Sequence, residues 1–71
     1  MKVYFWDAVA KRLTDIGAFG HGQSGMDVSP MDIPLKGDFI KDDFNRFWEV
    51  IGREHYWTGT THEMTLHLQR L

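Results

Sequence analysis

"DFIKDDFNRFWEVIG", residues 38–52, shows the clearest hydrophobic periodicity in the chain. The apolar positions that recur at helical spacing are Ile40, Phe44, Phe47 and Ile51. Their offsets place them on one face of an α-helix. Asp38 stands before them as a candidate N-cap, and Gly52 follows as a candidate C-terminal stop. The sequence therefore predicts an amphipathic helix over residues 38–52.

Towards the N-terminus, the sequence predicts a short strand followed by another helix. Residues 2–6, "KVYFW", are β-branched and aromatic, which favours a strand. A second helical stripe runs through Trp6, Val9, Ala10, Leu13 and Ile16. Asp7 is placed to cap the start of this helix and Gly17 to close its end, so the prediction is a helix over residues 7–17. The alternative is that the strand continues through Ala10.

Between the two predicted helices, residues 17–37 follow no regular period. They contain five of the seven glycines and both prolines of the chain. A residue that precedes proline favours extended backbone. We therefore expect a long Gly/Pro-rich loop over residues 17–37, with a short extended piece near Met31–Leu35.

The C-terminal part of the sequence predicts a β-hairpin. Tyr56 and Trp57 precede a turn at residues 59–61, and Met64, Leu66 and Leu68 then alternate with polar residues. The expected order is β-α-loop-α-β-β. This order predicts an α+β fold, with two helices packed on a short, mostly antiparallel sheet, in a single domain over residues 1–71.

The composition limits the classes of function. The chain has 71 residues, no cysteine and a formal net charge of −2. The absence of cysteine excludes disulfides and thiolate metal sites, and fits a cytoplasmic protein. With no basic face, we expect no direct nucleic-acid binding. The apolar run Val3–Trp6 is too short for a signal peptide or a membrane span, so we expect no membrane contact.

The glycine motif "GHGQSG", residues 20–25, matches the G-x-G-x-x-G pattern of dinucleotide-binding turns. That motif needs a strand before it and a helix after it. Here a predicted helix precedes it, and Pro30 and Pro34 follow it. We therefore expect a mobile contact loop at His21 and its neighbours, and no cofactor.

Residues 62–67, "HEMTLH", are one residue longer than the H-E-x-x-H zinc motif. On a strand this spacing sends His62 and His67 to opposite faces, so one metal ion does not readily take both. Convergence of these two with His21 and His55 remains open, because non-local metal sites leave no spacing pattern. Asp42 and Asp43 are neighbours on one predicted helix and do not face each other across a cleft. The sequence thus predicts no catalytic residues, no metal site and no enzyme.

The favoured hypothesis is a small non-enzymatic protein–protein interaction module. It would act as a regulator or inhibitor of a larger host protein, of the kind that phages and mobile elements encode. The residues assigned to the partner interface are Trp48, Trp57, Asp38, Asp42, Asp43, Phe19 and His21. The tryptophans would supply apolar anchors, and the carboxylates would match a basic protein partner. A homodimer is a further expectation, since three sets of adjacent aromatic residues leave aromatic surface outside the main core.

Two alternatives from other classes stay open at this point. The first is an acidic nucleic-acid mimic that blocks a basic groove. The second is a metal- or ligand-binding module that uses the histidines and the glycine loop.

Overall fold

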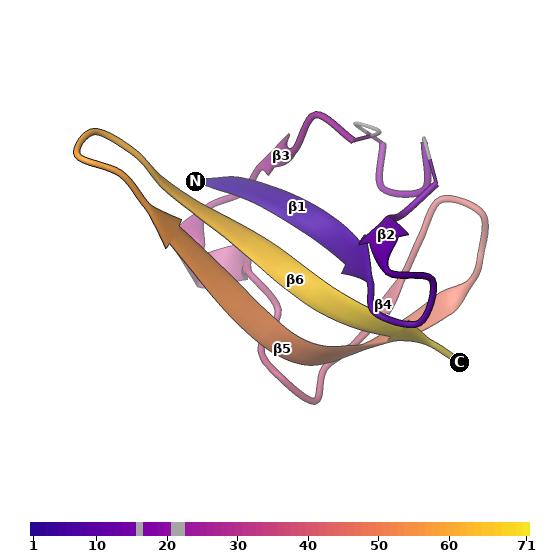
Figure 1. Cartoon of the computed structure of the whole chain (residues 1–71). Helices are drawn as coiled ribbons and strands as arrows, with labels where there is room; N and C mark the ends of the chain where they lie inside the picture. Colours follow the sequence, from indigo (N-terminus) through magenta and orange to yellow (C-terminus); the bar gives the residue numbers. More distant parts are fainter. Residues whose placement is uncertain (16, 21–22) are drawn as a thin grey trace.

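The computed structural model describes residues 1–15, 17–20 and 23–71. The described residues form strands and one turn of 3₁₀ helix, and they contain no α-helix. The elements are β1 (Lys2–Asp7), β2 (Arg12–Leu13), β3 (Met26–Asp27), η1 (Pro30–Asp32), β4 (Phe39–Lys41), β5 (Phe47–Trp57) and β6 (His62–Arg70). The predicted α+β fold with two helices is therefore wrong. The chain folds as a strongly twisted, mostly-β structure (Figure 1).

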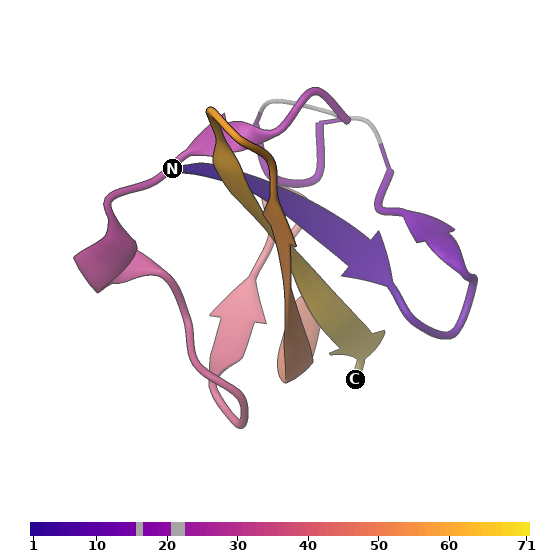
Figure 2. The same ribbon diagram turned by 60° about the vertical axis from the view of Figure 1, so that its left-hand side comes forward.

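The strands form one mixed sheet in the order β2-β1-β6-β5-β4, and β3 also pairs with β1. β5 and β6 make the long antiparallel hairpin that the C-terminal pattern predicted. β1 lies parallel to β6, so the first and last strands are neighbours. β2 and β3 pair with different halves of β1. Figure 2 shows η1 and β4 on the side of the hairpin away from β2.

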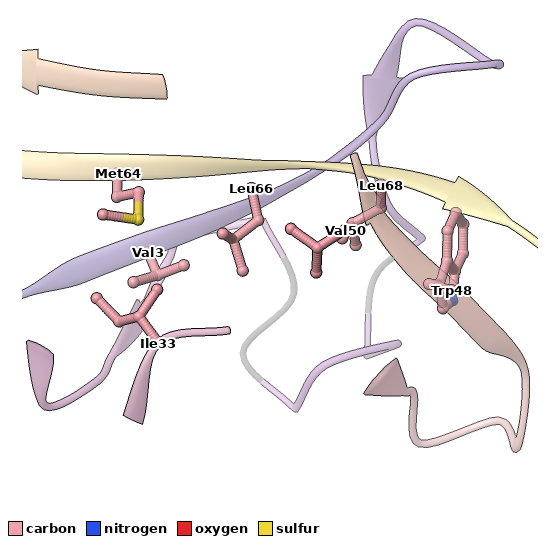
Figure 3. Packing of buried hydrophobic residues seen from close by; sticks show 7 residues of the cluster. All are labelled: Val3, Ile33, Trp48, Val50, Met64, Leu66 and Leu68. Carbon is pink, nitrogen blue, oxygen red and sulfur yellow. The ribbon is translucent and has the colours of Figure 1, made fainter. Parts of the chain in front are cut away.

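The core lies on one face of β1, β6 and β5. Its buried side chains are Val3, Ile33, Trp48, Val50, Met64, Leu66 and Leu68. Figure 3 shows Ile33, which follows η1, packed beneath Val3. Phe19 and Val28 pack against the same cluster from the segment between β2 and η1. The irregular part of the chain thus covers one sheet face, where the sequence predicted helices.

Residues 38–52 form two strands and a turn, where the sequence predicted a helix. Asn45 has a φ of 64°, which a right-handed helix does not allow. From residue 47 onward the side chains alternate, and Trp48 and Val50 point into the core. The side chain of Phe44 in the predicted helical stripe is instead 54% exposed. A period of two therefore governs this segment, because it pairs with β6.

Residues 7–17 do not form the predicted helix either. Asp7 ends β1, and its Oδ1 accepts hydrogen bonds of 3.0 Å from the N–H groups of both Val9 and Ala10. Lys11 then has a φ of 58°, and the chain returns as β2. Asp7 therefore caps a turn, and the prediction that it caps a helix is wrong. The alternative strand through Ala10 is also wrong, because β1 ends at Asp7.

The segment 17–37 contains β3 and η1 and otherwise lacks regular structure in its described part. Gly25 has a φ of 88°, which favours glycine. Among the described residues, no helix is long and apolar enough to cross a bilayer.

Candidate functional site

The face of the sheet opposite the core carries three rows of residues across β1, β6 and β5. Their register gives the rows Trp6–His67–Gly52, Tyr4–Thr65–Glu54 and Lys2–Glu63–Tyr56. We call these nine residues the open face. In the described part of the chain, no strand or helix packs across it, and Figure 1 views the sheet from this side, with β4 and η1 behind. Alternation along each strand separates these side chains from the buried ones.

Contacts between rows and strands hold the polar side chains of the open face in place. The hydroxyl of Tyr4 lies 3.4 Å from Oε2 of Glu63, to which it donates. His67 Nε2 lies 3.0 Å from Oε1 of Glu54. The ring of Trp6 is tilted against the His67 ring, with 6.4 Å between centroids. The open face therefore combines aromatic rings with carboxylates on three paired strands.

The same side of the sheet continues towards β4. Phe47 is on this side because it alternates with the buried Trp48, and Phe39 pairs with Glu49 there. Both phenylalanine side chains are more than half exposed. Apolar surface thus extends beyond the open face to the far edge of the sheet.

The tip of the β5–β6 hairpin carries a second group of aromatic side chains. Trp57 stacks on His62 with 3.5 Å between centroids and 7° between planes. His62 Nε2 lies 2.8 Å from Nδ1 of His55. Burial, followed by repulsion from His55 and from the N-terminal ammonium, lowers the pKa of His62 below its ordinary value of 6.5. Trp57 is 68% exposed, so this cluster lies at the surface.

A buried polar network holds the turn between β4 and β5. Asp42 is only 5% exposed, and its Oδ2 accepts hydrogen bonds from Trp48 Nε1 at 2.9 Å and Arg46 Nε at 2.8 Å. Its Oδ1 accepts two more, from the backbone N–H groups of Phe44 and Arg46. Burial raises the pKa of Asp42, but these donors together outweigh it and lower the pKa from 3.8 to about 2. Arg46 also bridges to Asp15, with 3.0 Å between Nη1 and Oδ2.

Three residues that the sequence assigned to a partner interface are buried or half-buried. Trp48 is 2% exposed, and Asp42 binds its indole N–H. Phe19 is half-buried and stacks on Phe5, with 4.2 Å between centroids. All three side chains pack within the fold and stabilise it.

The remaining assigned residues do not come together. Asp43 lies in the turn before β5, whereas Trp57 ends that strand. Asp38 accepts a hydrogen bond of 2.7 Å from the backbone N–H of Leu35 and lies just before β4. All three are exposed. His21 lies outside the described residues.

The residues that the sequence hypothesis missed are those of the open face, above all Tyr4, Trp6 and Tyr56. Alternation within "KVYFW" and "EHYW" would have placed them on one side of their strands. Which strands are neighbours, however, depends on the parallel pairing of β1 with β6.

The part of the chain that the structure describes forms no pocket. The same residues hold no group of three or more histidine and carboxylate side chains that could bind a metal ion. Comparisons with protein-family models, with curated proteins and with solved structures gave no significant match.

Proposed function

We propose that this chain is a small non-enzymatic module that binds a partner protein through its open face. The observation that carries the proposal is a sheet face across which no described strand or helix packs, where the exposed Tyr56 and the half-buried Tyr4 and Trp6 lie beside two carboxylates. Tyrosine and tryptophan are enriched at the energetic centres of protein interfaces. The other sheet face forms the core, so the open face is free of that role.

The charges of the open face favour a basic partner surface. Glu54 and Glu63 carry negative charge, and the only lysine or arginine among the nine residues is Lys2. Neighbouring side chains already position both carboxylates, through His67 and Tyr4. A preorganised surface loses less conformational entropy on binding than a flexible one. Aromatic anchors would supply affinity. The carboxylates would orient the partner and raise the association rate.

A chain of this size acts most simply by occupying a surface of a larger protein. This fits the role of a regulator or an inhibitor in the host cell. We place that role in the cytoplasm, since the sequence contains no cysteine.

Capture of partners from host lysate, followed by affinity measurement with the purified partner, tests the proposal. Trp6→Ala should weaken binding by about tenfold or more, as expected for an aromatic anchor at an interface. Glu63→Lys should weaken it and reduce its salt dependence. Met31→Ala is the control, because Met31 is 94% exposed and lies on η1, away from the open face. If folded Trp6→Ala binds as well as Met31→Ala, the open face is not the binding surface.

A further inference from the structure

The outer edge of β5 is unpaired over much of its length. β4 pairs only with residues 47–49 of β5, and Gly37 and Asp38 then bond the backbone of Val50. From Arg53 to Trp57, β6 is the only strand paired with β5 in the described residues, and no other strand lies along this edge in Figure 1. Alternate residues there direct N–H and C=O groups away from β6. Such an edge is a template for another strand.

Arg53–Trp57 lacks the two residue types most often found on blocked edges, proline and lysine, and its charged residues are Arg53 and Glu54. This segment, "REHYW", begins after the register shift of β5, which lies between Val50 and Gly52. Its regular register with β6 continues to Trp57. These five residues therefore keep a regular register, and their outer edge can pair with five residues of a second strand.

The segment is also complementary to itself. A two-fold axis at His55, perpendicular to the sheet, would place Arg53 opposite Trp57 of the partner subunit, on the core side of the sheet. The same axis would place Glu54 opposite Tyr56 of the partner subunit, on the side of the open face. Both pairs are favourable, the first as a cation–π contact and the second as a hydrogen bond to a carboxylate.

Neighbouring registers are less favourable. An axis at Glu54 sets two glutamates directly opposite each other, which is repulsive. An axis at Tyr56 sets Glu54 opposite Thr58 and removes Trp57 from Arg53. The side chains of this edge thus favour one symmetric arrangement, centred on His55.

We propose that two copies of this chain pair antiparallel along β5, with His55 on the two-fold axis. The two sheets then become one continuous sheet, and both open faces lie on the same side of it. This inference rests on the β5 edge and not on the proposed function. It implies that the assembly offers two equivalent faces to its partners, which raises effective affinity for a repeated target.

Sedimentation equilibrium across a range of protein concentrations, at about pH 8 where histidines are ordinarily neutral, tests this pairing. The wild-type chain should show a monomer–dimer equilibrium. His55→Lys and His55→Glu should each raise the dimer dissociation constant by about tenfold or more, because like charges would meet on the axis. An equimolar mixture of the two variants should restore dimerisation as a heterodimer. This rescue is expected when residue 55 lies opposite residue 55 of the partner subunit, because the lysine and glutamate side chains then meet on the axis.

Control variants and outcomes separate this idea from the proposed function. Lys11→Glu reverses an exposed charge in the turn between β1 and β2, on the far side of the sheet from the β5 edge, and should leave the dimer unchanged. Trp6→Ala should weaken partner binding without weakening the dimer. A wild-type chain that stays monomeric throughout, or a dimer that His55→Lys leaves intact, overturns the pairing. A dimer lost only in Trp6→Ala would assign self-association to the open face. Far-UV circular dichroism confirms that each variant is folded.

Discussion

Replacing Asp42 by asparagine should destabilise the protein and flatten its response to acid. The carboxylate accepts four hydrogen bonds while its side chain is almost fully buried. Asparagine keeps one acceptor oxygen but presents an amide N–H₂ where the second oxygen stood. That group would face either the Trp48 indole N–H or the backbone donors, and all of these are donors too. The network then contains unsatisfied buried groups, which cost free energy.

The magnitude follows from the pKa of Asp42. Its folded-state pKa is about 2, against an ordinary value of 3.8. The difference between a pKa of 3.8 and one of about 2 corresponds to about 2 kcal/mol in the free energy of unfolding. Because the folded pKa is the lower one, this contribution is fully present above pH 3.8 and is lost as the pH falls through about 2.

Urea unfolding, followed by tryptophan fluorescence at a series of pH values, measures both effects. At about pH 7, Asp42→Asn should lower the free energy of unfolding by about 2 kcal/mol. Between pH 3.8 and about 2 its stability should fall less steeply than that of the wild type. Asp43→Asn is the matched control, since Asp43 is the exposed neighbour. Equal stability of the Asp42→Asn variant and the wild type, or equal pH slopes, would refute the reasoning.

Three other substitutions test separate features by the same unfolding measurement. Since the pKa of His62 is lowered, first by burial and then by His55, the wild type should lose stability as the pH falls below 6.5, and His62→Gln should lose less. Gly25→Ala should cost about 1–2 kcal/mol, because φ is +88° there and the new Cβ would lie 2.6 Å from Cγ of Lys2. Leu66→Ala should cost about 2–5 kcal/mol, because Leu66 is fully buried in the core. A smaller effect of Leu66→Ala than of an exposed substitution would contradict the assigned core.

The helix prediction for residues 38–52 was wrong because the same residues fit both a helical period and the alternation of a strand. Ile40, Phe44 and Phe47 satisfy a helical stripe, whereas Trp48 and Val50 satisfy alternation. The strand places the second pair in the core. Isolated helices of this length are marginal in water, so tertiary pairing decides between the two states. Here the contacts with β6 favour the strand. The pairing of β5 with β6 cannot be predicted from residues 38–52 alone.

The capping evidence at Asp7 was ambiguous for a related reason. An aspartate that binds the backbone N–H groups two and three residues ahead begins a turn as well as a helix. Only the residues that follow distinguish a turn from a helix. Lys11 adopts a left-handed backbone conformation, and the hydrophobic pattern of the sequence does not predict it. By contrast, the alternation at Met64, Leu66 and Leu68 correctly predicted a half-buried strand, because no helical period competed with it.

The open face was harder to predict from the sequence than the hairpin. The consecutive aromatic residues at positions 4–6 do imply that some aromatic surface faces away from the core, as Tyr4 and Trp6 do in β1. Their neighbours on β6 follow some sixty residues later and are reached through a parallel pairing. Contacts at such long separation leave no local pattern, so a single sequence does not reveal which side chains share the face.

One register fixes both the core and the open face. Val3 lies opposite Met64 in the core, and Tyr4 lies opposite Thr65 on the other side. A slip of β1 by one residue along β6 would turn Tyr4 towards the core and Val3 towards solvent. The slip would also separate Trp6 from His67, and the three rows of the open face would no longer form. Core packing therefore selects the surface chemistry, and a core substitution that shifts β1 should abolish partner binding without altering any residue of the open face.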